Sequence, residues 1–91
     1  MKQLNLEDIR TALYEMNIPA VRNFPEETLK NADFWFDLGM DERNVIYLIS
    51  NLEMAKRVKV PALIWDSLKE KNNVYILLHA VNAHIIDLDK Q

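Results

Sequence analysis

The 91-residue chain has no cysteine, one glycine and three prolines. The lack of cysteine excludes disulfide bonds, thiolate metal ligands and a thiol nucleophile. The scarcity of glycine disfavours β-hairpins, because their tight turns need residues that tolerate positive φ. Apolar residues recur instead with the three-to-four-residue spacing of amphipathic helices, and no segment alternates with period two. The sequence therefore predicts an all-α fold.

Long apolar runs and an excess of basic charge are also missing. The longest apolar run, 74–78, is far shorter than a membrane span, and residues 1–8 contain no apolar stretch of signal-peptide length. The formal charge is −3, and basic residues are not interleaved with aromatic ones as on a nucleic-acid-binding surface. We therefore expect a cytoplasmic protein that has no membrane span and does not bind nucleic acid.

Residues 1–91 fit a single domain with one core, since 49% of them are hydrophobic and 27% are charged. Three longer helices and one short helix are predicted. The longer ones run from an N-cap at Asn5 to about Met16, from an N-cap at Asp41 to about Arg57, and from a cap at Asn72 or Asn73 to Ile85. The short one runs from Pro61 to about Leu68. A long first loop over 17–40 should contain at most a short turn of helix, and residues 87–91 should be a frayed tail.

Each predicted helix has an apolar face. The residues expected to point inward are Leu6, Ile9, Leu13, Met16, Val45, Leu48, Ile49, Leu52, Leu63, Ile64, Trp65, Val74, Leu77, Leu78, Val81 and Ile85. In the long loop, Phe34, Trp35 and Phe36 are three consecutive rings that cannot all point inward. We expect Phe34 to pin the loop to the core, and Trp35 or Phe36 to be the exposed ring.

A family resemblance becomes visible around the start of the second predicted helix. The segment is Asn31-Ala32-Asp33-Phe34-Trp35-Phe36-Asp37-Leu38-Gly39-Met40-Asp41, followed by apolar Val45, Leu48 and Leu52, by Glu53, and by Val58-Lys59-Val60-Pro61. This pattern resembles an acyl carrier protein, and the spacing from Asp37-Leu38-Gly39 to Pro61 matches that family without a gap. The resemblance extends from about Leu6 to Ile85 and implies an acyl-carrier-protein-like four-helix bundle with a longer first loop.

The most specific element of that family is missing. Its members carry a phosphopantetheine arm on a serine that follows Asp-Leu-Gly-x-Asp and precedes a leucine, and these two positions are Glu42 and Arg43 here. A carboxylate has no hydroxyl with which to attack the pyrophosphate of coenzyme A, so Glu42 cannot carry the arm. We therefore expect a degenerate member of the family, without phosphopantetheine, without catalytic residues and without enzyme activity.

Another serine has a similar local context. Asp66-Ser67-Leu68 repeats the tripeptide of the attachment site, but no Leu-Gly precedes it and Trp65 is adjacent. The alternative function is a working acyl or peptidyl carrier that uses Ser67 as an atypical attachment residue, or that binds a ligand non-covalently between the second and third helices. The simpler interpretation of Ser67 is a polar position in the short helix.

The outward face of the second predicted helix is the candidate partner surface. Partners of acyl carrier proteins dock on an acidic surface at this helix, whereas Lys56, Arg57 and Lys59 make its C-terminal end basic here. The residues expected to bind a partner are Met40, Arg43, Tyr47, Met54, Trp35 and Phe36. A half-buried ring that packs on the first loop is the alternative for Tyr47. We expect a non-catalytic protein-interaction, scaffold or regulatory module whose partner is an acyl-processing enzyme or another carrier protein.

No metal site is expected. His79 and His84 are five residues apart on the last predicted helix, about 140° around its axis, so they cannot share a metal ion. Asp33, Asp37 and Asp41 repeat every four residues, but they lie in a predicted loop, where Asp41 is best explained as a helix cap.

Overall fold

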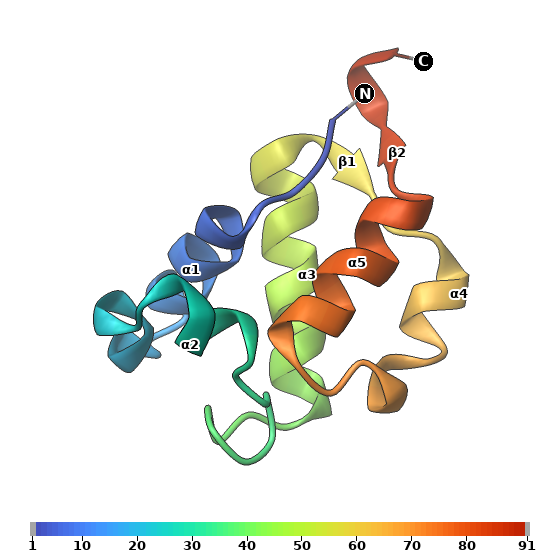
Figure 1. The fold of residues 1–91 in the computed structure, drawn as a ribbon. Helices are drawn as coiled ribbons and strands as arrows, with labels where there is room; N and C mark the ends of the chain where they lie inside the picture. Colours follow the sequence, from blue (N-terminus) through green and yellow to red (C-terminus); the bar gives the residue numbers. More distant parts are fainter. Residues whose placement is uncertain (1, 91) are drawn as a thin grey trace.

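The computed structural model of the protein describes residues 2–90. In chain order its elements are α1 (Leu6–Glu15), the 3-10 helix η1 (Pro19–Asn23), α2 (Glu26–Lys30), α3 (Glu42–Lys56), β1 (Val58–Lys59), α4 (Ala62–Trp65), η2 (Leu68–Glu70), α5 (Val74–His84), β2 (Ile86–Asp87) and η3 (Leu88–Lys90) (Figure 1). The prediction of a mainly helical domain is confirmed, and the small sheet was not predicted. Among residues 2–90, no helix combines the length and hydrophobicity that a membrane crossing requires.

The three longest helices begin at predicted cap residues. Asn5 and Asp8 form a reciprocal pair at α1, in which each side chain accepts a hydrogen bond from the other residue's backbone N–H at 2.9 Å. Asp41 and Asn44 form the same box at α3. The side chain of Asn73 caps α5. These bonds satisfy backbone donors that have no partner inside the helix, which explains why the helices start where they do.

The core surrounds α3, which lies between α1 on one side and α4 and α5 on the other (Figure 1). Among its fully buried side chains are Ile9, Leu13, Leu29, Phe34, Val45, Leu48, Ile49, Leu68 and Leu77. Within residues 2–90, no polar or charged residue is buried. Burial of apolar side chains is therefore the main stabilising force, and the predicted inward face of α3 is confirmed.

The first loop holds two short helices, η1 and α2, where at most one short turn was predicted, and it is tied to α1 and to the start of α5. The Arg10 guanidinium donates to the carbonyl oxygens of Val21 and Phe24, at 2.6 Å each. Leu29, in the short helix α2, and Phe34 are completely buried. Farther along, the Phe34 N–H donates to the Asn72 carbonyl oxygen at 2.9 Å. The loop that precedes α3 is therefore fixed against both neighbouring helices.

The prediction that Leu63 points inward is wrong. Leu63 is 60% exposed, whereas Ile64 is buried and Trp65 is half-buried. Consecutive residues of a helix point about 100° apart, so a four-residue helix on the surface cannot turn three neighbouring side chains inward. The Trp65 indole N–H donates to the Val60 carbonyl oxygen at 2.9 Å, which orients α4 against the chain that leads into it.

The predicted frayed tail is also wrong for residues 87–90, while Gln91 lies outside the described residues. Strand β2 pairs antiparallel with β1, with Val58 opposite Asp87 and Lys59 opposite Ile86. The Leu88 N–H then donates to the Arg57 carbonyl oxygen at 3.1 Å. Strands of two residues are too short for a period-two pattern, so sequence periodicity does not reveal them. The first and last described residues meet at the same end of the molecule (Figure 1).

Candidate functional site

The outer face of α3 combines apolar and basic side chains. Tyr47 is 54% exposed and Met54 is 74% exposed, and Arg43 is exposed on the same side of the helix. Residues 43, 47 and 54 lie within about 40° of one another around a regular helix axis. The structure thus brings three of the predicted partner-binding residues onto one exposed strip, which we call the α3 strip.

Met40 does not belong to the α3 strip, contrary to the prediction. Its side chain is 6% exposed and is part of the core. Gly39, with φ of 64°, turns the chain, and the Met40 N–H then donates to the Phe34 carbonyl oxygen at 2.8 Å. A positive φ costs glycine nothing, whereas other residues adopt it with strain. Helical spacing does not continue across this turn, and for that reason the prediction that placed Met40 outside is wrong.

The three consecutive rings have three different environments. Phe34 is fully buried, Trp35 is half-buried against the core, and Phe36 is 88% exposed. The rings of Phe34 and Trp35 meet edge to face with centroids 6.3 Å apart. Phe36 is therefore the ring that faces solvent, and among the large hydrophobic residues of the described chain it is the most exposed.

Asp33 organises the turn that carries Phe36. Its Oδ1 accepts hydrogen bonds from the backbone N–H groups of Trp35, at 2.8 Å, and Phe36, at 2.9 Å. Its carbonyl oxygen accepts from the N–H groups of Asp37 and Leu38. The Asp37 carboxylate in turn accepts from the Asp33 N–H at 2.8 Å. A side chain with this many backbone donors fixes a turn, so Asp33 and Asp37 have a structural explanation that needs no cation.

Glu42 is the first residue of α3 and is exposed. It follows the cap at Asp41, where its carboxylate lies near the positive end of the helix dipole. Ser67 is half-buried, and its hydroxyl donates to the Leu63 carbonyl oxygen at 2.9 Å. Position 42 is thus open to solvent but has no hydroxyl, whereas Ser67 uses its hydroxyl within the fold.

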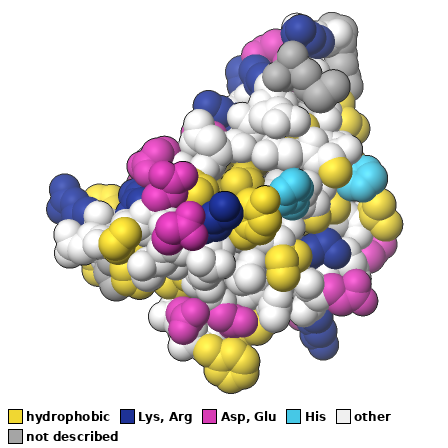
Figure 2. All heavy atoms as spheres, in the orientation of Figure 1, with side chains coloured by type: hydrophobic (Ala, Val, Ile, Leu, Met, Phe, Trp, Pro, Cys, Tyr) yellow, Lys and Arg dark blue, Asp and Glu magenta, His cyan; other side chains and the backbone are white. Residues whose placement is uncertain are grey.

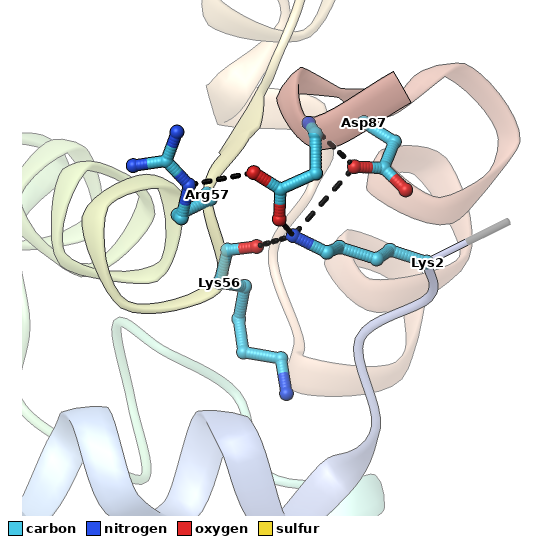
Figure 3. Close-up of polar contacts among 5 residues, drawn as sticks. Lys2, Lys56, Arg57 and Asp87 are labelled. Carbon is cyan, nitrogen blue, oxygen red and sulfur yellow. Dashed lines mark hydrogen bonds and ion pairs between the residues drawn. The ribbon is translucent and has the colours of Figure 1, made fainter.

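An ion-pair cluster joins the two chain ends to the end of α3 (Figure 3). The Lys2 Nζ donates to the Lys56 carbonyl oxygen at 2.8 Å and to the Asp89 carboxylate at 2.5 Å, and it lies 3.6 Å from the Asp87 carboxylate. The Arg57 Nε donates to the other Asp89 oxygen at 2.7 Å. Hydrogen bonds from Lys2 and Arg57 lower the pKa of Asp89, and Asp89 raises the pKa of both cations.

The same end of α3 carries an open groove of about 410 Å³. It is lined by Glu53, Met54, Arg57, Val58, Lys59 and Leu88. The contribution of Leu88 was not predicted, because the C-terminal residues were expected to be frayed. The only signal available was the presence of apolar Ile86 and Leu88 in a tail expected to be solvated.

The two ends of α3 differ in charge. Residues 31–42 contain three aspartates, one glutamate and no lysine or arginine, whereas Lys56, Arg57 and Lys59 follow at the other end. In Figure 2, hydrophobic and acidic side chains adjoin at the lower edge of the molecule, and Lys and Arg side chains gather at the upper end together with acidic ones. The basic groups at the end of α3 are thus partly neutralised, and the acidic segment before it is not balanced by cations of its own.

The histidines do not form a metal site. Within residues 2–90, no three His, Asp or Glu side chains are placed to hold a metal ion together. His79 and His84 are both exposed. The His79 Nε2 lies 2.9 Å from the Tyr75 hydroxyl, and the Lys30 Nζ lies 4.6 Å from the centroid of the Tyr75 ring. These contacts pack side chains on the surface of α2 and α5 and bring no reactive pair together.

Comparison of the chain with protein-family models, curated proteins and solved structures gives no match.

Proposed function

We propose that this chain is an acyl-carrier-protein-like domain that bears no phosphopantetheine arm and acts as a non-catalytic protein-interaction, scaffold or regulatory module. The observation that carries the proposal is Glu42. It follows Asp37-Leu38-Gly39 and the cap Asp41, at the first position of a long helix, and it is exposed. The residue that would hold the arm is thus accessible and has the wrong chemistry.

The arrangement of helices supports the resemblance. A long α1, a long α3, a short α4 followed by η2, and a long α5 occur in the order that the four-helix bundle of an acyl carrier protein implies. The long loop between α1 and α3 holds the additional residues expected there. The apolar positions Val45, Leu48 and Leu52, on which the resemblance partly depends, are all buried.

A glutamate at position 42 supports the proposal that this chain bears no phosphopantetheine arm. Transfer of phosphopantetheine needs an oxygen nucleophile that forms a stable phosphodiester, and a serine hydroxyl is such a group. A carboxylate would give a mixed anhydride, which water hydrolyses. Without the arm there is no thiol and hence no thioester at this position.

The α3 strip supports a role in binding. Tyr47 and Met54 leave apolar surface on a helix whose opposite side already forms the core, and Arg43 adds a planar cation. Aromatic residues, methionine and arginine are enriched at protein interfaces. An acyl-processing enzyme or another carrier protein is the partner that this surface would contact at the helix used by the carrier family.

A phosphopantetheinyl transferase assay tests the proposal. Incubation with coenzyme A and a broad-specificity transferase should leave the intact mass of the protein unchanged. The double variant Glu42→Ser with Arg43→Leu should gain the mass of one arm, because it restores the hydroxyl and the leucine after it.

The Ser67→Ala variant is the matched control, since it removes the other candidate hydroxyl. A mass gain in the wild-type protein that disappears in Ser67→Ala would overturn the proposal and establish a working carrier with an atypical attachment residue. A double variant that folds but is not modified would contradict the assignment of position 42 to an attachment site.

A further inference from the structure

Residues 86–90, which form β2 and η3, are held at the end of α3 without a buried side chain of their own. Four of the five residues are exposed, and Asp87 is half-buried. Their backbone is held by the two-residue pairing with β1 and by the Leu88 N–H, which donates to the Arg57 carbonyl oxygen at 3.1 Å. Because apolar burial is the main stabilising force in proteins, a segment that buries no complete side chain opens at a small free-energy cost.

Ion pairs complete the attachment of this segment (Figure 3). The Lys2 Nζ donates to the Asp89 carboxylate and lies 3.6 Å from the Asp87 carboxylate. The Arg57 Nε donates to Asp89 at 2.7 Å, and the Arg57 and Asp89 side chains are 69% and 46% exposed. Exposed ion pairs are individually weak and are screened by salt. The charges that hold residues 86–90 therefore form an attachment that a rise in ionic strength weakens.

Residues 2–5 are anchored by a different kind of contact. The Leu4 side chain is buried and belongs to the core. The Asn82 side-chain amide accepts a hydrogen bond from the Leu4 N–H and donates one to the Leu4 carbonyl oxygen, at 2.8 Å each. These bonds join neutral groups, so salt screens them little. Lys2 therefore stands on a fixed support, from which its Nζ also donates to the Lys56 carbonyl oxygen at 2.8 Å.

We propose that residues 86–90 form a salt-sensitive latch, which opens as a unit while residues 2–5 and α3 keep their places, and that Lys2 is the residue that closes it. Lys2 contacts both latch carboxylates, Asp87 and Asp89, and it contacts them from the anchored segment. The latch does not depend on the resemblance to carrier proteins, and the transferase assay does not bear on it.

Opening of the latch changes what this end of the molecule presents to solvent. Lys2 and Arg57 lose their carboxylate partners, and β1 loses the strand that pairs with it. A strand edge without a partner is a template on which another strand can pair. Ionic strength thus regulates access to two cations and to the edge of β1.

Hydrogen exchange at individual amides of the full chain, followed by NMR, tests the latch. Relative to their intrinsic rates, the Leu88 N–H should exchange at least about 100-fold faster than the amides inside α3, and the Leu4 N–H at least about 10-fold slower than the Leu88 N–H. Between about 20 mM and about 1 M NaCl, exchange at Leu88 should rise about 3- to 10-fold, whereas exchange at Leu4 should stay within about twofold.

The variant Lys2→Gln tests which residue closes the latch. In low salt it should speed exchange at Leu88 about 3- to 10-fold, and added salt should then have less effect than in the wild-type protein. Lys56→Gln is the matched control, because it removes one positive charge at the same end of α3 from a side chain whose Nζ pairs with Asp8 at 3.5 Å. Exchange at Leu88 should stay within about twofold of the wild-type rate in this control, and thermal melts should show that both variants fold.

A disulfide lock tests whether the latch opens as a unit. Lys59 and Ile86 lie opposite each other in the pairing of β1 with β2, both are exposed, and the chain has no cysteine of its own. The double variant Lys59→Cys with Ile86→Cys should, once oxidised, slow exchange at Leu88 at least about 5-fold and abolish its salt dependence. Reduction of the disulfide should restore both. Unchanged exchange at Leu88 in the oxidised form would contradict opening as a unit.

Three further results would overturn the proposal. One is exchange at Leu88 as slow as that inside α3, which would show that residues 86–90 open only when the whole protein unfolds. Another is a rise in exchange at Leu4 that follows the rise at Leu88, since both segments would then loosen together. The last is an equal effect of Lys2→Gln and Lys56→Gln, which would mean that net charge, rather than the contacts of Lys2, closes the latch.

Discussion

The chain turns sharply at both ends of α3, but different forces hold the two turns. Before the helix, Asp33 accepts hydrogen bonds from backbone N–H groups within five residues, and Gly39 takes the positive φ. After the helix, Arg57 takes a positive φ of 53°, and partners from both chain ends hold the turn through Lys2 and Asp89. The first turn is built from local bonds to neutral groups. The second combines backbone hydrogen bonds, such as that from the Leu88 N–H to the Arg57 carbonyl oxygen, with ion pairs between residues far apart in sequence.

This difference has physical consequences. Hydrogen bonds between a carboxylate and nearby backbone N–H groups form as soon as the local chain adopts the turn, and salt screens them little. Ion pairs between exposed side chains are weakened by salt and contribute modestly. We therefore expect the turn before α3 to keep its shape under conditions in which the turn after α3 loosens. A loose second turn would also alter the groove, because Leu88 forms one of its walls.

The largest expected effect is a difference in stability between variants of two rings of the first turn, Phe34 and Phe36. Phe34→Ala should lower the free energy of unfolding by about 3–5 kcal/mol, because it leaves a cavity where a fully buried ring was. Phe36→Ala should change it by less than about 0.5 kcal/mol, since that ring is solvent-exposed. Urea unfolding followed by circular dichroism measures both. Equal losses for the two variants would show that Phe36 packs on the protein in solution.

A smaller effect tests whether Asp33 fixes the first turn. Asp33→Ala should lower the free energy of unfolding by about 1–2 kcal/mol, because two backbone N–H groups lose their acceptor. Asp33→Asn keeps an oxygen acceptor and should retain most of the stability. The loss in Asp33→Ala should be the same at low and high salt. A loss that high salt abolishes would mean that the charge of Asp33, rather than its hydrogen bonds, stabilises the turn.

Local patterns explain which parts of the fold could be predicted. The bounds of α3 follow from an acceptor at Asp41 and from apolar residues at positions 45, 48, 49 and 52, all within one segment. Its outward strip follows from the same spacing, which is why Tyr47 and Met54 were placed correctly on the surface. Met40 was misplaced because the positive φ of Gly39 breaks the spacing just before the helix.

The turn directly after α3 could not be predicted because it depends on distant partners. Lys2 and Asp89 are 87 residues apart, and Arg57 and Asp89 are 32 apart, so no local pattern connects them. The pairing of β1 with β2 involves two residues on each strand, too few to show alternation. The groove also depends on residues far apart in sequence, because Leu88 forms one of its walls and must pack at the end of α3.

The smallest expected effect concerns Asp89, at the centre of the second turn. Hydrogen bonds from Lys2 and Arg57 hold its pKa below the ordinary value of 3.8, so the folded protein favours the charged carboxylate. This stabilisation is fully present above the pKa that Asp89 has in the unfolded chain. It is lost as the pH falls through the lower pKa that Asp89 has in the folded protein. The pKa of Lys2 is raised by the same pair, so the stabilisation holds while Asp89 is charged and is lost again only when the pH rises above the ordinary Lys2 value of 10.5.

Asp89→Asn should therefore melt slightly below the wild-type protein at pH 7 in low salt, by less than Asp33→Ala does. The difference in melting temperature between Asp89→Asn and the wild-type protein should be constant from about pH 5 to about pH 9 and shrink below about pH 4. It should nearly vanish in about 1 M NaCl. Differential scanning calorimetry at these conditions checks the prediction, with Asp33→Ala as the salt-insensitive control. If the lower melting temperature of Asp89→Asn persisted in 1 M NaCl, hydrogen bonds rather than ion pairs would hold both turns.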